Sequence, residues 1–266
     1  MAKRRLDALL ADRGLFESRS RAAASVLAGE VRIGLDGVRA AKPGQLVSDD
    51  AVVHLDDRPR YVSRGGIKLA NALSSSRVDP RGRRCLDVGA STGGFTDCLL
   101  QAGAAHVVTL DVAYGELAWS LRTDPRVTVI ERSNARYVDP GMLPYAPDLI
   151  VVDVSFISLR TVLGPVLATA AASFDALAMV KPQFELGRGR VGKGGVVGRS
   201  ADRREALVAV GDAARGLGVA VLGFHSSGLP GPKGNRETFI ALAEPARAVG
   251  LGEPSIEALA LEVEPG

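Results

Sequence analysis

The sequence predicts an α/β fold in two parts: a small α+β module and a larger domain with a mostly parallel sheet covered by helices on both faces. Three observations lead to this prediction. From residue 84 onward, short apolar runs alternate with helical stretches, a glycine-rich loop follows the first of these runs, and positive charge is concentrated before them. Parallel strands require crossover connections, and helices usually provide them.

The composition is that of a folded chain without a membrane-spanning segment. The 266 residues suffice for one large and one small domain, and the hydrophobic fraction of 46% provides for a core. No apolar run reaches the length of a membrane span, and the N-terminal stretch MAKRRLDALLADRG lacks the apolar segment of a signal peptide. We therefore expect a cytoplasmic, monomeric protein without a membrane partner.

Cysteine and histidine are too few and too scattered for a disulfide framework or a metal site. Cys85 and Cys98 do not form a CxxC pair, and the three histidines, His54, His106 and His225, lie far apart in the sequence. We expect inert, buried thiols and no bound metal.

Charge differs between the two parts of the chain. Residues 1–84 contain 17 Lys and Arg against 10 Asp and Glu, whereas the remaining residues contain 16 against 20. Basic charge next to a second domain favours a polyanionic partner, because Lys and Arg that neutralise phosphates gain affinity from released counterions. A solubilising surface is the alternative explanation.

The first module, residues 1–58, contains signals for two helices followed by a small sheet. Gly14 ends the first helix, Ser18 caps the second, and Gly29 ends it. The dipeptide Asp36-Gly37 predicts a hairpin, and the alternating segment VSDDAVVHLDD predicts a further strand.

The motifs of this module resemble the S4 RNA-binding domain of ribosomal proteins and RNA-modifying enzymes. The resemblance rests on RLDALLADRGL, on the following SRSRAAA, on GEVRI and on the closing DDAVVHL. It implies contacts with structured RNA that depend on shape more than on sequence. The residues for which it implies phosphate contacts are Arg4, Arg5, Arg19, Arg21 and Lys42.

Residues 59–63 are predicted to be an interdomain linker, since charged residues and Pro59 interrupt the pattern there. The larger domain, residues 64–266, begins with a turn at Gly65-Gly66 and a helix that carries Lys68 near its start. The helix dipole disfavours a lysine at that position, which is a first hint of a function for Lys68, and a surface lysine is the default alternative. We also expect Arg64 to contact RNA.

Five apolar runs predict the parallel strands of the larger domain. The runs are CLDVG, HVVTLD, VTVIE, DLIVVD and ALAMVK, and the helical stretches between or after them include ELAWSLRT and LRTVLGPVLATAAAS. A final pair of strands lies in VLGFHSSGLPGPKGNRETFIAL, and Glu237 returns to the same rim of the sheet if these two strands are antiparallel. Such a Rossmann-like domain binds its ligands in the crevice at the carboxyl ends of the strands.

A glycine-rich loop at the first of these strand ends indicates a ligand that carries a ribose. The residues Gly89, Ser91 and Gly93 let the backbone approach a ligand closely. Asp111 follows Asp87 by about twenty residues, the spacing at which a carboxylate meets ribose hydroxyls. The loop alone also fits a tight turn in another α/β domain.

The same loop favours S-adenosylmethionine over a dinucleotide. A dinucleotide fingerprint requires GxGxxG, whereas Ser91 stands at the second glycine position here. S-adenosylmethionine has no phosphate, and its ammonium group suits an acid such as Asp87. Asn134, just beyond the third strand, is expected to hydrogen-bond the adenine.

Four charged residues, Lys68, Asp153, Lys181 and Glu237, are each predicted at a strand end or a helix start. Their order resembles the K-D-K-E set of FtsJ-like 2′-O-ribose methyltransferases. Such a set suits methyl transfer from a sulfonium to a sugar hydroxyl. We expect Lys181 to act as the base or to orient the hydroxyl, Lys68 to add positive potential, and the two acids to fix the ammonium groups.

Nearly the whole chain resembles the TlyA family, also labelled haemolysin A. The resemblance rests on the pairing of the two domains and on VSRGGIKL, LDVGASTGGFTDCLL, VDVSFISL, VKPQFE and LPGPKGNRE. It implies methylation of a cytidine 2′-hydroxyl in 16S or 23S ribosomal RNA, or both, with ribosomal RNA or ribosomal subunits as partners. The S-adenosylmethionine-binding positions that it implies are Asp87, Gly89, Ser91, Gly93, Asp111, Asn134 and Asp153.

The chain departs from this family in the linker. Some members carry an RxWV linker thought to couple the domains, whereas Arg60-Tyr61-Val62 stands here. Coupling through a tryptophan therefore cannot be carried over to this chain.

The basic segment GRGRVGKGGVVGRS, residues 187–200, is predicted to close over RNA as a mobile lid, with Arg188 and Arg190 in contact with the RNA. An ordinary flexible hairpin is the alternative.

Two other functions compete with the enzyme: a non-catalytic RNA-binding ribosome-assembly factor and a secreted cytolysin. The K-D-K-E set speaks against the first, and the lack of a spanning or basic amphipathic segment speaks against the second.

Overall fold

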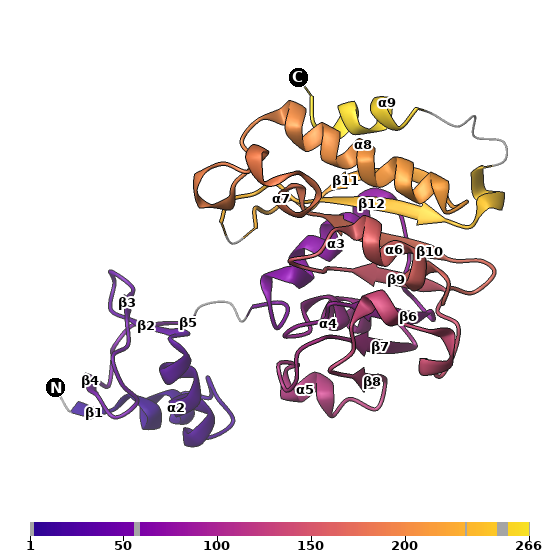
Figure 1. The fold of residues 1–266 in the computed structure, drawn as a ribbon. Coiled ribbons are helices and arrows are strands. Elements are labelled where there is room, and N and C mark those ends of the chain that lie inside the picture. The colour runs from indigo at the N-terminus through magenta and orange to yellow at the C-terminus, as the bar shows by residue number, and fades with distance from the viewer. Residues whose placement is uncertain (1–2, 56–58, 232, 249–254, 266) are drawn as a thin grey trace. The chain divides into compact units, whose positions relative to one another are not determined.

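The computed structural model describes residues 3–55, 59–231, 233–248 and 255–265 (Figure 1). It divides the chain into two compact units, Met1–Arg60 and Tyr61–Gly266. The division falls within the stretch that the sequence predicts to be a linker.

The first unit packs two short helices against two small sheets. Ser18 caps the second helix by accepting a hydrogen bond from the backbone N–H of Arg21 at 3.2 Å, and Gly29, with φ at +78°, ends it. The core contains Leu6, Leu10 and Val31, which are fully buried. Its elements are β1 (Lys3–Arg5), α1 (Leu6–Asp12), α2 (Arg19–Ala28), β2 (Val31–Ile33), β3 (Val38–Arg39), β4 (Leu46–Ser48) and β5 (Val53–Leu55).

The second unit is built on a seven-stranded sheet with the order β11-β12-β10-β9-β6-β7-β8. The ladders from β10 to β8 are all parallel, whereas β12 runs antiparallel to both of its neighbours, which is the condition for Glu237 to return to the rim of the sheet that carries Lys181. The strands are β6 (Arg84–Val88), β7 (His106–Leu110), β8 (Val127–Ile130), β9 (Leu149–Val152), β10 (Asp175–Val180), β11 (Ala220–Ser226) and β12 (Thr238–Ala243).

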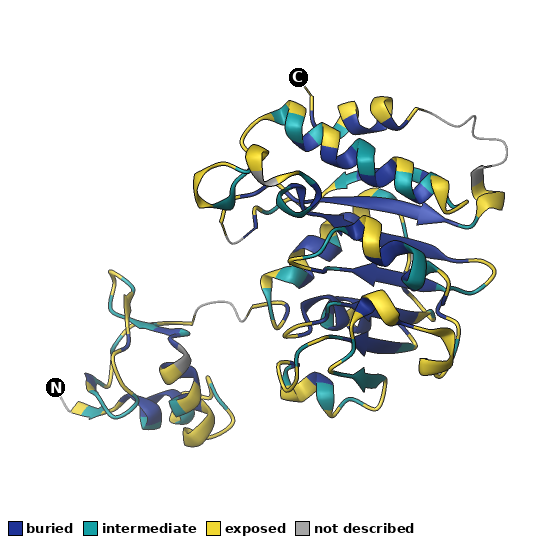
Figure 2. Ribbon diagram, in the orientation of Figure 1, coloured by how far each residue is buried: buried dark blue, intermediate teal, exposed yellow. Residues whose placement is uncertain are grey.

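Helices cover both faces of this sheet, so that the central strands are buried on both sides (Figure 2). The helices α3 (Arg64–Ser76), α4 (Gly94–Gln101) and α5 (Trp119–Arg122) pack on one face, and α6 (Leu159–Leu167), α8 (Ser200–Gly216) and α9 (Ile256–Val263) pack on the other. A further short helix, α7 (Pro182–Glu185), follows β10. The predicted fold class is therefore confirmed.

Some element boundaries differ from the sequence-based expectation. The turn expected at Gly65-Gly66 is the first turn of α3, because Ser63 accepts a hydrogen bond from the N–H of Gly65 and thereby caps the helix one residue before Arg64. The helix expected over residues 159–173 ends at Leu167, where the hydroxyl of Thr169 takes the carbonyl of Val166. The helix expected over residues 116–123 is reduced to α5.

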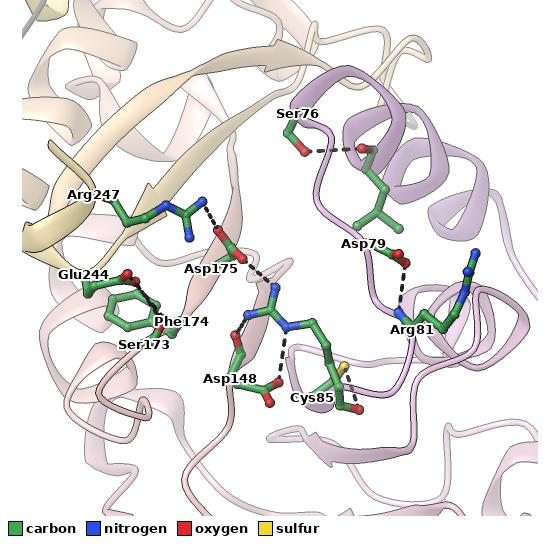
Figure 3. Close-up of polar contacts among 12 residues, drawn as sticks. Ser76, Asp79, Arg81, Cys85, Asp148, Ser173, Phe174, Asp175, Glu244 and Arg247 are labelled. Atoms are coloured by element: carbon green, nitrogen blue, oxygen red, sulfur yellow. Dashed lines mark hydrogen bonds and ion pairs between the residues drawn. The ribbon is translucent and has the colours of Figure 1, made fainter. Parts of the chain in front are cut away.

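An ion-pair network links the amino ends of the parallel strands (Figure 3). The guanidinium of Arg83 contacts the carboxylates of Asp148 and Asp175, and Asp175 also receives Arg247 at 3.1 Å. Asp148 precedes β9, Asp175 begins β10, and Arg247 follows β12. The network therefore holds together the edge of the sheet that lies opposite the strand ends carrying the candidate site.

Within the described ranges, no helix is long and apolar enough to cross a membrane.

Candidate active site

The glycine-rich loop lies where β6 and β9 end side by side. Gly89 directly follows β6 and has a φ of +83°. A Cβ atom at this position would lie only 2.5 Å from the carbonyl oxygen of Asp153. Because real Cβ atoms do not approach a carbonyl so closely, only glycine lets these two strand ends meet.

Asp111 holds the far side of the same loop. It follows β7, and its two carboxylate oxygens accept hydrogen bonds from the N–H groups of Ser91 and Ala113 at 2.7 and 2.8 Å. Ser91 itself adopts a φ of +47°, which is uncommon for a residue with a side chain. The structure thus brings Ser91 and Asp111 together, as the loop motif predicts.

Asp87 is fully buried at the end of β6, and only one of its two carboxylate oxygens is hydrogen-bonded within the described part of the chain. Its Oδ2 accepts a hydrogen bond from the Thr96 hydroxyl at 2.6 Å, whereas Oδ1 has no hydrogen-bond partner among the described residues. Burial, with smaller contributions from Asp153 and Asp111, raises the pKa of Asp87 to about 7. A carboxylate in this situation is stabilised by a cationic group placed at Oδ1.

The four residues of the K-D-K-E set form two ion pairs. Lys68, on α3, pairs with Glu237, and both side chains are almost completely buried. Lys181 pairs with Asp153 at 2.5 Å, and its Nζ also donates to the hydroxyl of Ser155 at 2.8 Å. Each ammonium group is thus fixed by a carboxylate.

The sheet register brings these two pairs close together. Val180 and Thr238 are the last paired residues of the antiparallel ladder between β10 and β12. Lys181 directly follows Val180, and Glu237 directly precedes Thr238. The two residues therefore lie opposite each other where the ladder ends. This arrangement depends on β12 being antiparallel to β10.

A cavity of about 440 Å³ joins the ion pairs to the glycine-rich loop. It is lined by residues from the start of α3, from the loop and from the end of β9, namely Ser63, Arg64, Gly65, Lys68, Gly89, Ala90, Ser91, Thr92, Gly94, Phe95 and Asp153. One space therefore borders both the predicted cofactor loop and members of both ion pairs.

Four of the predicted cofactor residues are not in the lining of this cavity, namely Asp87, Gly93, Asp111 and Asn134. Gly93 has its neighbours Thr92 and Gly94 in the lining, but its own Cα faces α5, where a Cβ would lie 2.3 Å from Leu121. Asn134 is exposed, and its side chain accepts a hydrogen bond from the N–H of Arg136 at 3.0 Å. Its contact with adenine stays a prediction.

The arginines predicted to bind RNA in the first unit are largely paired with acids. Arg4 contacts Asp12 and lies 3.4 Å from Asp49. Arg5 and Arg19 both contact the buried Asp7, and chiefly the hydrogen bonds from Arg5 lower the pKa of Asp7 to about 2. The side chains of all three arginines remain partly exposed, as does the predicted Lys42, whereas Arg21 borders a separate pocket of this unit.

The basic residues predicted to bind RNA in the second unit also have protein partners. Arg64 donates to the carbonyl of Pro230 at 2.8 Å, and Arg190 pairs with Glu205 on α8. The side chain of Arg188 lies outside the described part of the chain. The contacts of these residues with RNA stay predictions.

The segment 187–200 is tied to the loop that leads to Glu237. The buried side chain of Asn235 accepts from the N–H of Val197 at 2.9 Å and donates to the carbonyl of Gly195 at 2.7 Å. Arg203, which pairs with Glu264, donates to the carbonyl of Gly198 at 2.7 Å. The movement of this segment as a lid stays a prediction.

Sequence reasoning missed several residues beside the ion pairs. Phe156 has 91% of its surface exposed, adopts a φ of +63°, and lies with its ring centroid 5.3 Å from that of Phe184. Ser155 contacts Lys181, and Glu185 is buried between the two segments. The sequence contained a signal for the two aromatic residues, because VDVSF and VKPQF each place a phenylalanine three positions after a member of the K-D-K-E set.

Among the described residues, no cluster of His, Cys, Asp and Glu is arranged to hold a metal ion.

Comparison with known proteins identifies relatives over almost the entire chain. A family profile described as FtsJ-like methyltransferase matches residues 61–244. The 16S/23S rRNA (cytidine-2′-O)-methyltransferase TlyA of Mycobacterium tuberculosis (strain ATCC 25618 / H37Rv) is 51% identical over 245 residues, which cover 91% of each chain. The putative rRNA methyltransferase YqxC of Bacillus subtilis (strain 168) is 42% identical over 246 residues, which cover 91% of this chain and 86% of the relative.

A solved structure has the same fold over both units. The structure of a putative hemolysin from Streptococcus thermophilus matches with a TM-score of 0.73 and 37% sequence identity. The match covers 98% of this chain and 96% of that one.

Proposed function

Because the chain belongs to the TlyA family of FtsJ-like methyltransferases, we propose that it transfers a methyl group from S-adenosylmethionine to the 2′-hydroxyl of a cytidine in 16S or 23S ribosomal RNA. The predicted family membership is thereby confirmed. The observation that carries the proposal is the pairing of Lys68 with Glu237 and of Lys181 with Asp153 beside the glycine-rich loop.

The residues around the cavity fit S-adenosylmethionine. The unpartnered Oδ1 of Asp87 suits an ammonium group, and Gly89 borders the cavity without a side chain that would occupy it. Asp111, fixed by two backbone N–H groups, keeps further lone pairs for ribose hydroxyls. The remaining family positions, Gly93 and Asn134, are part of the same proposal as a packing residue of the loop and as an adenine contact.

When bound, S-adenosylmethionine supplies a methyl group activated by a sulfonium. The task of the protein is then to orient the acceptor hydroxyl and to receive its proton as the new C–O bond forms. We assign this task to Lys181, which receives the proton as a neutral amine and becomes an ammonium group paired with Asp153, because Asp153 and Ser155 fix the direction of its side chain. Lys68, held by Glu237, adds positive charge at the wall of the cavity.

Phe156 is proposed to contact the base of the acceptor nucleotide. The exposed ring of Phe156 directly follows Ser155 and lies three residues after Asp153, both of which contact Lys181, and it offers a surface on which an unstacked base can lie. The ring of Phe184 supports it from the segment that follows Lys181.

The first unit is proposed to be an S4-like RNA-binding domain that delivers ribosomal RNA to the second. Arg4, Arg5, Arg19, Arg21 and Lys42 are the proposed phosphate contacts. The partial exposure of the paired arginines supports this assignment, because a guanidinium that contacts one carboxylate keeps further N–H donors.

The experiment that tests the proposal measures methyl transfer by the purified protein to unmodified ribosomal RNA, offered both free and in assembled subunits. We expect a labelled methyl group on a cytidine and resistance of the following phosphodiester to alkaline hydrolysis, because the 2′-oxygen is then blocked. A substrate with 2′-deoxycytidine at the mapped position serves as the control and should accept no methyl group. Methylation of a base, or no incorporation into either form of RNA, would contradict the proposal.

A further inference from the structure

Two segments of the second unit carry the residues nearest to the proposed methyl transfer. The segment after β9, residues 153–158, contains Asp153, Ser155 and Phe156, and the segment after β10 runs from Lys181 through α7 to Glu185. The relative position of these two segments decides whether Lys181 and Phe156 face the same nucleotide.

A single buried carboxylate joins the two segments. The side chain of Glu185 is only 1% exposed, and its Oε1 accepts a hydrogen bond from the N–H of Leu159 at 2.7 Å. Its Oε2 accepts from the hydroxyl of Ser158 at 2.5 Å. Arg160 adds a contact from its Nε to Oε2 at 3.4 Å and a hydrogen bond from its Nη2 to the backbone carbonyl of Glu185 at 3.1 Å.

The carboxylate does more than the end of α6 requires. Ser158 already caps this helix, since its hydroxyl accepts a hydrogen bond from the N–H of Arg160 at 3.2 Å. A capped, partly exposed helix start needs no buried acid from another segment. What Glu185 adds is a fixed connection between the strand ends of β9 and β10.

This connection bears on Phe156, whose backbone is strained. A left-handed conformation at a bulky residue costs about 1 to 3 kcal/mol and persists only where the surroundings impose it. Phe156 lies two residues before Ser158, and its ring contacts Phe184, the residue next to Glu185. Glu185 thus holds the end of the segment 153–158, and Phe184 of α7 contacts the ring of Phe156 within it.

We propose that Glu185 is a positioning residue for the acceptor nucleotide, which acts by holding the Phe156 segment against the Lys181 segment. The proposal rests on the proposed function, because it assumes that Phe156 and Lys181 meet the same nucleotide. It does not involve the cofactor loop, to which Glu185 makes no described contact.

The test compares Glu185→Gln with Glu244→Gln. Glu244 makes the same kind of contact at the opposite edge of the sheet, where it accepts from the N–H of Phe174 at 3.0 Å and from the Ser173 hydroxyl (Figure 3). We expect Glu185→Gln to lower kcat/KM for RNA by about ten- to a hundredfold, the effect of a misplaced acceptor, while the Kd for S-adenosylmethionine is unchanged. Glu244→Gln should leave both constants as they are.

A double-mutant cycle separates positioning from simple loss of stability. If Glu185 acts through Phe156, then Glu185→Gln should have little further effect in a Phe156→Ala background. Ser158→Ala, which leaves Glu185 in place but removes one of its donors, should lower kcat/KM in the same direction by a smaller factor and covers the case in which Glu185→Gln folds poorly.

The outcomes distinguish this inference from the function on which it rests. An active wild-type protein with Glu185→Gln no different from Glu244→Gln would overturn the positioning role alone, as would fully additive effects in the cycle. Failure of the wild-type protein to methylate RNA would instead overturn the proposed function.

Discussion

Replacing Lys181 with alanine is expected to lower the kcat of methyl transfer by about a thousandfold, within the range that a positioned proton acceptor contributes. The side chain is 10% exposed and makes two fixed contacts, with Asp153 and Ser155. Alanine removes the group that meets the acceptor hydroxyl, whereas the glycine-rich loop is untouched. The Kd for S-adenosylmethionine, measured by calorimetry, should therefore change little.

The control for this variant removes a cation elsewhere on the same sheet. Arg126 precedes β8 at the opposite edge and pairs with Asp124 at 2.7 Å. Arg126→Ala should leave kcat unchanged. Turnover by Lys181→Ala at more than about a tenth of the wild-type rate would remove Lys181 from the proposed reaction, because so small a loss is below the usual effect of an acid or base.

Replacing Asp87 with asparagine is expected to stabilise the protein without cofactor and to weaken its binding of S-adenosylmethionine. Burial raises the pKa of Asp87 from its ordinary value of 3.8 to about 7. Between pH 3.8 and about pH 7, Asp87 is protonated in the folded state but ionised in the unfolded state. The free energy of unfolding therefore falls as the pH rises through this interval. The full difference corresponds to about 4 kcal/mol above pH 7.

Asparagine removes this penalty while it keeps an acceptor for the Thr96 hydroxyl. Denaturant unfolding of both proteins should show a stability difference that grows by about 3 kcal/mol from about pH 5 to above pH 7, in favour of the variant. In the same range, wild-type affinity for S-adenosylmethionine should rise as Asp87 ionises. Asp212→Asn, a substitution at an exposed position of α8, should show no such growth. A stability difference independent of pH would contradict the raised pKa.

The strands of the second unit could be predicted because they are buried on both faces. Such strands consist of continuous apolar residues, as in LIVV of β9 and ALAMV of β10, where every residue is buried. Elements without a strong apolar pattern were harder: β1 consists of Lys3, Arg4 and Arg5, and only its pairing with β4 makes it a strand. The extent of α5 likewise depends on the fold around it.

The members of the charged set could be predicted from the strand ends, but their partners could not. Nothing in the sequence says that Lys68 pairs with Glu237 rather than with Asp153, because this depends on the register between β10 and β12. The strained backbone of Phe156 is also invisible in a pattern of residue types. The roles of these residues stay predictions that the variants above test.

The antiparallel strand β12 has a consequence for synthesis of the protein. Glu237 directly precedes β12 and is therefore synthesised long after the glycine-rich loop and α3. Because β12 lies between β10 and β11 in the sheet, this strand must be in place before Glu237 can pair with Lys68. A chain that ends before residue 237 therefore lacks the carboxylate that pairs with Lys68 in the proposed site. If Glu237 has the role proposed for it, methyl transfer is expected only from chains that have been translated through β12.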